Sequence, residues 1–127
     1  MTLKTLALGK RGEALAVTFL KKHGYRILEK NFKTPLGEID IIALDGDTVC
    51  FIEVKTRTDE TYGTPFEAVS KFKQRKLSQS ALLYLKRKNL LDQKARFDIV
   101  AVAQGEDGEY QPGILKDAFE LDSSYRY

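Results

Sequence analysis

The chain has 127 residues, of which 43% are hydrophobic and 31% are charged, a composition that predicts one globular domain over residues 1–127 and excludes a disordered chain. Its single cysteine excludes an intramolecular disulfide and a cysteine-based zinc site, and no apolar run approaches the roughly 18 residues of a membrane span. The net charge of +3 is unevenly distributed, with +6 over residues 1–33, −5 over residues 34–60, +7 over residues 61–96 and −5 over residues 97–127.

The first predicted element is a helix over residues 9–23, which ends at Gly24 because glycine is the preferred residue just beyond a helix C-terminus. Glu13, Val17 and Leu20 fall on one stripe of this helix at i, i+4 and i+7 spacing. A glutamate on an apolar stripe is expected to face inward. The alternative is an ordinary glutamate near a helix N-terminus, where the helix dipole favours it.

Three strands follow, because the next segments are β-branched and apolar or alternate in polarity. They are predicted over residues 25–32, 38–44 and 48–56, with turns at Thr34-Pro35-Leu36-Gly37 and at Asp45-Gly46.

A polar loop is predicted next, then a long helix, then two more strands. The loop covers residues 57–64, the helix begins at a capping pattern at Thr64 or restarts at Ser70 and runs to about Asn89, and the strands cover residues 96–103 and 114–121 with a loop over 104–113 between them. The order α-β-β-β-α-β-β predicts an α/β fold, in which a mixed β-sheet is flanked by helices.

The second predicted hairpin fixes which side chains lie opposite one another. If Asp45-Gly46 forms a two-residue turn, Leu44 pairs with Asp47 and Asp40 lies opposite Phe51. Since side chains alternate along a strand and opposite residues share a face, four charged side chains are expected on one face of the hairpin. They are Glu38, Asp40, Glu53 and Lys55, while Ile39, Ile41, Ile52 and Val54 are expected on the other face.

This charged face has two interpretations. It is either a solvated strand surface with a Glu-Lys pair, or a cation site in which Asp40 and Glu53 lie as diagonal neighbours roughly 7–8 Å apart. The ligands on offer are carboxylate oxygens without Cys or His, which favours Mg²⁺ or Mn²⁺ over Zn²⁺. A lysine beside such a metal could position or deprotonate an attacking water, as phosphodiester hydrolysis requires.

The same residues carry a family resemblance. Gly37-Glu38-Ile39-Asp40, followed by Phe51-Ile52-Glu53-Val54-Lys55-Thr56-Arg57, resembles the core of PD-(D/E)xK nucleases. Together with Gly9-Lys10-Arg11-Gly12-Glu13, the chain resembles the small bacterial YraN-like family, which is similar to archaeal Holliday-junction resolvases and implies a restriction-endonuclease-like fold. The likeness covers roughly residues 9–103.

The resemblance implies a role for each matching residue. Asp40 and Glu53 match the metal-binding carboxylates, Lys55 matches the catalytic lysine, and Glu13 matches the acidic residue that completes the metal site in resolvase-like members. Glu38 belongs to the motif without a catalytic assignment, and we expect it to support the site from behind the metal ligands. Ile39 replaces the proline of the superfamily motif, a position that varies within the superfamily.

Two basic segments flank the acidic one, which is typical either of solvated helix faces or of a phosphate-binding surface. Beside a nuclease-like site the second interpretation is favoured. The residues expected to contact nucleic acid are Lys10, Arg11, Arg57, Lys71, Gln74 and Arg75.

The leading hypothesis is a divalent-metal-dependent endonuclease that acts on DNA more readily than on RNA, with selectivity for branched DNA left open. The alternatives are a nucleic-acid-binding module that keeps the fold without cutting, and an interaction protein whose charged segments meet in a dimer. By analogy with resolvases we expect a homodimer, because both strands of a junction are cut. The N-terminal segment is too short and interrupted for a signal peptide, so we expect a cytoplasmic protein with no membrane partner.

Overall fold

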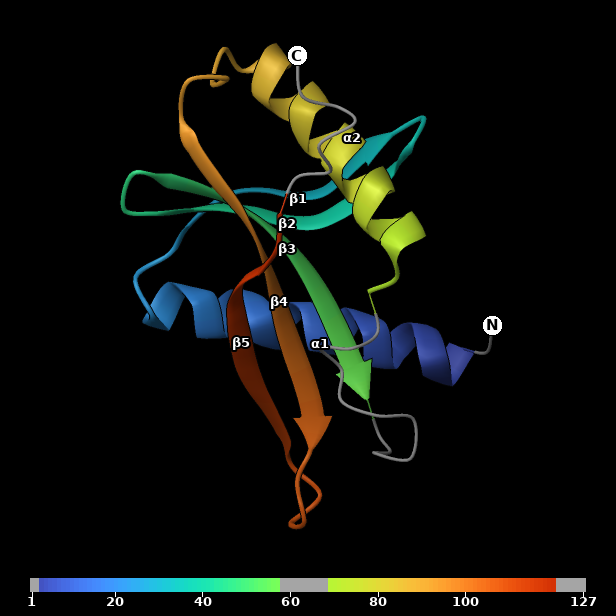
Figure 1. Ribbon diagram of the computed structural model, residues 1–127. Coiled ribbons are helices and arrows are strands. Elements are labelled where there is room, and N and C mark those ends of the chain that lie inside the picture. Colours follow the sequence, from blue (N-terminus) through green and yellow to red (C-terminus); the bar gives the residue numbers. More distant parts are fainter. Residues whose placement is uncertain (1–2, 58–68, 121–127) are drawn as a thin grey trace.

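The strands form one sheet, and their order in it follows their order in the chain (Figure 1). The computed structural model describes residues 3–57 and 69–120. The elements are α1 (Leu3–Lys22), β1 (Arg26–Thr34), β2 (Gly37–Asp45), β3 (Thr48–Arg57), α2 (Lys71–Arg87), β4 (Lys94–Gln104) and β5 (Tyr110–Phe119).

The sheet is mixed, because β3 and β4 run parallel while every other neighbouring pair is antiparallel. Helix α2 lies in the connection between the two parallel strands, as a crossover connection requires. Helices α1 and α2 lie on opposite faces of the sheet (Figure 1). The predicted α/β class, the mixed sheet and the order of elements are therefore confirmed.

Each face of the sheet has its own apolar core. On one face Ala16 and Leu20 of α1 pack in a cluster with Ile41, Ile52 and Val100. On the other face the buried side of α2 packs against β2, β3 and β4. The residues of α2 in this second cluster are Leu77, Ala81, Tyr84 and Leu85.

Both helices have well-defined ends. Gly24 adopts a left-handed conformation with φ of 87°, as expected of the predicted residue beyond the helix C-terminus. The N–H of Tyr25 donates to the carbonyl of Leu20 at 3.0 Å, which closes α1 with a Schellman motif. The start of α1 differs from the prediction, since the helix begins at Leu3 and continues through Gly9. Helix α2 begins after Ser70, whose side chain accepts the N–H of Lys73. The predicted capping pattern at Thr64 lies outside the described residues.

The predicted register of the second hairpin is wrong by two residues. Asp45 pairs with Thr48 and Leu44 with Val49, so the turn consists of Gly46 and Asp47, where Gly46 has a φ of 62°. A shift of two residues preserves the alternation of side chains between faces. Continuing this register places Asp40 opposite Glu53 instead of Phe51.

The regular alternation of β2 is broken at Asp40. Ile41 packs in the cluster under α1, whereas Ile39 packs in the cluster under α2, although two residues apart should share a face. The opposing residue on β1, Asn31, has a positive φ of 54°, and the two strands form no pair at Asn31 and Asp40. The prediction that Ile39 and Ile41 share one face is therefore wrong, because the chain is kinked between them.

Strand β5 begins at Tyr110, four residues before its predicted start. The predicted loop over residues 104–113 includes Pro112 and Gly113, because both residue types are depleted in strands. Among the strands of residues 3–57 and 69–120, β5 is the last in the sheet and pairs only with β4. An edge strand tolerates a proline because one of its sides needs no backbone donors.

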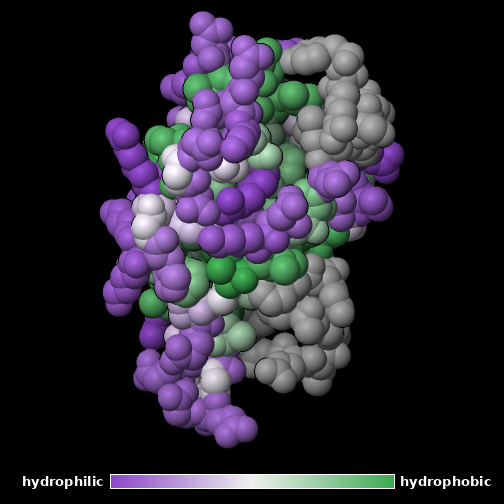
Figure 2. All heavy atoms as spheres, turned by 60° about the vertical axis from the view of Figure 1, so that its left-hand side comes forward, coloured by the Kyte–Doolittle hydropathy of each residue, from purple (hydrophilic) through white to green (hydrophobic). Residues whose placement is uncertain are grey.

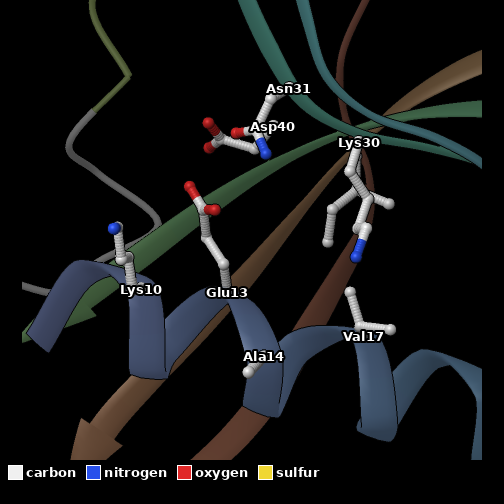
Figure 3. A pocket seen from close by; sticks show the side chains of 8 residues that line it. Lys10, Glu13, Ala14, Val17, Lys30, Asn31 and Asp40 are labelled. Carbon is white, nitrogen blue, oxygen red and sulfur yellow. The ribbon is translucent and has the colours of Figure 1, made fainter. Parts of the chain in front are cut away.

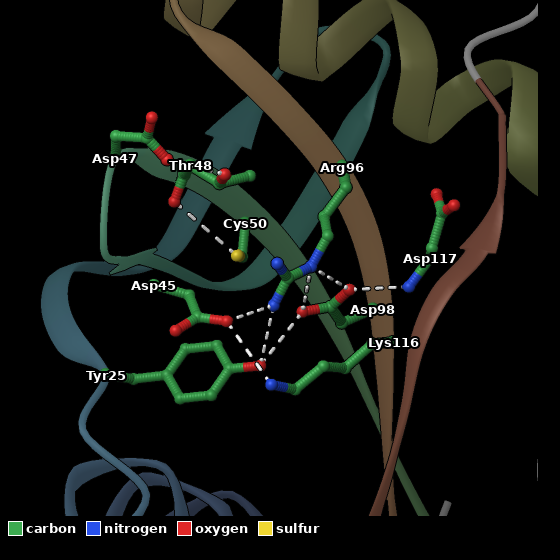
Figure 4. Close-up of polar contacts among 9 residues, drawn as sticks. All are labelled: Tyr25, Asp45, Asp47, Thr48, Cys50, Arg96, Asp98, Lys116 and Asp117. Carbon is green, nitrogen blue, oxygen red and sulfur yellow. Dashed lines mark hydrogen bonds and ion pairs between the residues drawn. The ribbon is translucent and has the colours of Figure 1, made fainter.

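A buried polar network joins β4 to β5 and to the start of β1 (Figure 4). Asp98 is fully buried and accepts hydrogen bonds from Arg96 Nε, from the Tyr25 hydroxyl and from the backbone N–H of Asp117. Arg96 also donates to Asp45 at 2.6 Å. Asp98, Arg96 and Asp45 each have a partner of opposite sign, as buried charged groups require.

The face toward the left of Figure 1 is covered largely by hydrophilic side chains, with smaller apolar areas between them (Figure 2). Neither helix described by the structure has the length and apolar character needed to cross a membrane.

Candidate active site

Asp40 lies at the point where β2 and β3 separate. The last backbone pair between these strands is Ile41 with Ile52. Beyond it, the carboxylate of Asp40 takes the place of a strand carbonyl, since its Oδ2 accepts the N–H of Val54 at 2.8 Å. This hydrogen bond fixes one carboxylate oxygen and anchors the side chain between the diverging strands.

Glu13 approaches Asp40 from α1. Both line a pocket of about 270 Å³ between the helix and the sheet, and Figure 3 shows their carboxylates pointing toward one another. The other residues that line this pocket are Lys10, Ala14, Val17, Lys30, Asn31 and Ile41. The inward orientation predicted from the stripe of Glu13, Val17 and Leu20 agrees with this position.

The close approach of α1 to β3 determines where Glu13 lies. Gly12 is buried against Thr56, and a Cβ atom added at Gly12 would lie 2.0 Å from the Thr56 hydroxyl oxygen. A glycine at this contact allows the helix to approach the strand closely.

Glu53 lies on β3 with only 5% of its surface exposed, and it is neutralised by two lysines. Its Oε1 lies 3.4 Å from the Nζ of Lys55, two residues along the strand, and 2.5 Å from the Nζ of Lys73 on α2. Burial of a carboxylate is costly without such cations.

The carboxylates repel one another. Burial, with the charges of Glu53 and Glu13, raises the pKa of Asp40 to about 7, although the hydrogen bond from Val54 opposes this shift. Burial, with the charges of Glu38 and Glu53, raises the pKa of Glu13. Four acidic side chains thus interact at one end of the hairpin, and Glu38 is the exposed member of the group.

The lysines beside Glu53 shift in opposite directions. Burial and the neighbouring ammonium group of Lys73 lower the pKa of Lys55. Burial alone would lower the pKa of Lys73 as well. The hydrogen bond and the electrostatic attraction between Lys73 and Glu53 outweigh this effect, so the pKa of Lys73 is raised.

Asp40 differs from the other aspartate that accepts a strand N–H. Asp98 is paired directly with Arg96, whereas Asp40 makes no ion pair within 4.0 Å among the described residues. In the same part of the chain, no three His, Cys, Asp or Glu side chains are close enough to ligate one metal ion together. The negative charge at Asp40 is therefore incompletely compensated.

The residues expected to contact nucleic acid are placed differently from one another. Lys10, Lys71 and Arg75 are exposed. The guanidinium group of Arg11 lies over the ring of Tyr110, 5.4 Å from its centroid.

Two further candidates lie near the ends of their elements. The side-chain amide of Gln74 donates to the carbonyl of Val69 at 3.1 Å, which fixes the start of α2. Arg57 is the last residue of β3, where its backbone pairs with Ala103.

Lys73 is the residue of this site that the sequence analysis did not single out. It lies four residues before Leu77 and eight before Ala81, so it extends the apolar stripe of α2 toward the sheet. The same reasoning that placed Glu13 would have found it. The uncertain start of the helix, at Thr64 or at Ser70, obscured the stripe.

Comparison with known proteins gives one family. The family model described as "Uncharacterised protein family UPF0102" matches residues 12–102. The chain is 52% identical to a UPF0102 protein of Geobacter metallireducens over 122 residues, which are 95% of this chain and 98% of that one. It is 50% identical to a UPF0102 protein of Geotalea uraniireducens over 115 residues, 91% of each chain. It is 48% identical to one from Syntrophus aciditrophicus over 118 residues, 93% of this chain and 92% of that one.

Proposed function

We propose that this chain, which belongs to the uncharacterised protein family UPF0102, is a divalent-metal-dependent endonuclease that hydrolyses phosphodiester bonds in DNA. This family is the YraN-like family predicted from the sequence motifs. The observation that carries the proposal is the electrostatic coupling of Asp40 with Glu53 and with Glu13, which lines the same pocket, while Lys55 and Lys73 contact Glu53.

The residues present fit a hard divalent cation. Burial, with the charges of Glu53 and Glu13, raises the pKa of Asp40 to about 7, and a cation near Asp40 would relieve the repulsion between these carboxylates. Carboxylate oxygens are the ligands that Mg²⁺ and Mn²⁺ prefer. Asp40 and Glu53 would hold the ion with support from Glu13, and the bound ion would polarise a phosphoryl oxygen and acidify water.

The protein's own side chains supply the remaining requirements. The N–H of Val54 holds the Asp40 carboxylate in a fixed orientation, which preorganises the site. Lys55 is held on the same face as Glu53, and its lowered pKa suits a group that orients or deprotonates water. The exposed Lys10, Lys71 and Arg75 would bind phosphates of the same nucleic acid.

Cleavage of a panel of labelled DNAs tests this proposal. Single strands, duplex, flap and four-way junction would be incubated with Mg²⁺, with Mn²⁺ and with chelator. We expect metal-dependent cleavage, and loss of at least about 100-fold in Asp40→Asn, because the amide cannot supply the negative charge.

The matched control is Asp92→Asn, which removes the same charge from an exposed position after α2 and should cleave normally. Cleavage that persists in pure Asp40→Asn protein would refute the assignment. Salt-sensitive DNA binding without any cleavage by the wild type would instead identify a binding module that keeps the fold.

A further inference from the structure

Glu53 is contacted by two ammonium groups at the same carboxylate oxygen, although one cation would balance its charge. Lys73 is the closer of the two, at 2.5 Å against 3.4 Å for Lys55. The charge of Lys73 also lowers the pKa of Asp40, and that of Asp40 raises the pKa of Lys73. Lys73 therefore interacts with both carboxylates that the proposed function assigns to the metal.

The two lysines differ in how easily they can leave. Lys55 is on the same strand as Glu53, its side chain is 19% exposed, and its backbone is paired in the sheet. Lys73 comes from a different element and its side chain is 41% exposed, so it can turn into solvent without disturbing the sheet. Of the two ammonium groups that contact Glu53, only that of Lys73 can therefore leave the carboxylate and move into solvent easily.

The start of α2 holds Lys73 in place, although the helix dipole there disfavours a positive charge. The backbone N–H of Lys73 donates to the Ser70 side chain at 3.1 Å, and buried Val69 anchors the start of α2 in the core. The first turn of α2 has no acidic residue, so a lysine there opposes the positive end of the helix dipole. Its compensation is the ion pair with Glu53.

We propose that Lys73 is an internal counter-ion that a divalent metal ion displaces from Glu53, and that its released ammonium group then binds a phosphate of the nucleic acid. This inference rests on the proposed function. It makes Lys73 a substrate-binding residue that becomes available only after the metal binds, since a single ammonium group contacts first the carboxylate and then the phosphate.

Metal affinity tests the first step without any cleavage assay. Mn²⁺ binding to the full chain would be measured by titration calorimetry for the wild type, Lys73→Met and Lys76→Met. Lys73→Met is expected to bind Mn²⁺ about three- to tenfold more tightly, because the ion no longer displaces an ammonium group. Lys76→Met removes the same charge from a lysine that contacts Phe72, and its affinity should stay within about twofold of the wild type.

Lys73→Arg keeps a cation on Glu53 and is expected to bind Mn²⁺ no more tightly than the wild type. Circular dichroism would show whether Lys73→Met has a folding defect. If it has one, Lys73→Arg still provides a folded variant at this position. Equal Mn²⁺ affinity in the wild type and Lys73→Met overturns the inference and leaves the proposed function intact. Absence of Mn²⁺ binding in all four proteins overturns the proposed function itself.

DNA binding tests the second step. Binding of a labelled duplex would be measured for wild type and Lys73→Met with Ca²⁺ and with chelator, over a range of salt concentrations. We expect the Lys73→Met substitution to weaken DNA binding more with Ca²⁺ than with chelator. Only with Ca²⁺ should the salt dependence of DNA binding also decrease, by about the amount of one phosphate contact. An equal loss under both conditions would show that the metal does not release Lys73, and would overturn the inference.

Discussion

Asp40 and Asp98 each accept a backbone N–H in place of a strand carbonyl, but their surroundings differ. Asp98 is paired with Arg96 and the Tyr25 hydroxyl, and so serves the stability of the sheet. Asp40 lies among other carboxylates, and its pKa is raised to about 7. In the metal-free protein, ionised Asp40 therefore opposes folding.

The sign of its pH dependence follows from the raised pKa. The folded protein keeps the Asp40 proton up to about pH 7, whereas the unfolded chain loses it near pH 4, so the free energy of unfolding falls as pH rises between these values. Asp40→Asn cannot ionise and can still accept the N–H of Val54. We expect it to raise the free energy of unfolding by about 2–4 kcal/mol at pH 8, and by far less at pH 4.

Urea denaturation in chelator at the two pH values measures this difference, with Asp92→Asn as the control for loss of an exposed charge. A stabilisation of equal size at both pH values would contradict the pH dependence assigned to Asp40.

Helix α1 is positioned by its contact with β3 at Gly12. A Cβ at this position would lie 2.0 Å from Thr56 Oγ1, which a rotation of the threonine side chain could move away, and 3.1 Å from Thr56 Cβ, which no rotation of that side chain moves. We expect Gly12→Ala to lower the free energy of unfolding by about 1–3 kcal/mol, because the helix must move outward and carry Glu13 with it.

Gly9→Ala is the matched control, since it lies in the same helix with no atom within 4 Å of the added Cβ. That change should raise the free energy of unfolding by about 0.5–1 kcal/mol through helix propensity. Thermal or urea denaturation of both variants decides the matter, and changes of the same sign would refute the proposed contact.

The elements show how far local patterns determine this fold. The strands β2, β3 and β4 could be predicted because their apolar, β-branched runs are long and bounded by turn residues. The start of β5 could not be, because Pro112 is acceptable only where the strand lies at an edge, and strand order is a tertiary property. The hairpin register was missed because either Asp45-Gly46 or Gly46-Asp47 satisfies a two-residue turn.

The site was predictable to a similar extent. The face shared by Glu53 and Lys55 follows from strand alternation alone, and the inward side of Glu13 follows from helix periodicity. The kink at Asp40, which turns its carboxylate into the pocket below α1, depends on the left-handed Asn31 across the strand pair. No local pattern in either strand shows that pairing fails there.

At the scale of the whole molecule, Cys50 reports on opening of the core. It is fully buried in the cluster under α1, and burial together with the charge of Asp98 raises its pKa to about 12. Both factors oppose reaction, since the thiolate is the reactive form.

We expect the native protein at pH 8 to react with a thiol reagent at least about 100-fold more slowly than the protein in 6 M guanidinium chloride, because the reagent must wait for the core to open. The time course of labelling under the two conditions provides the measurement. Rapid labelling of the native protein would show that the sheet opens beneath α1 without global unfolding.

Both outer strands of the sheet are irregular along their lengths. At one edge, β1 contains a bulge between Ile27 and Glu29 and the left-handed Asn31. At the other, β5 contains Pro112 and the left-handed Asp117. Such edges resist strand addition from a second chain, which protects the sheet from edge-to-edge aggregation. Two copies that associate would therefore meet through helix or loop surfaces, and the strands that the structure describes would not join into one continuous sheet across both chains.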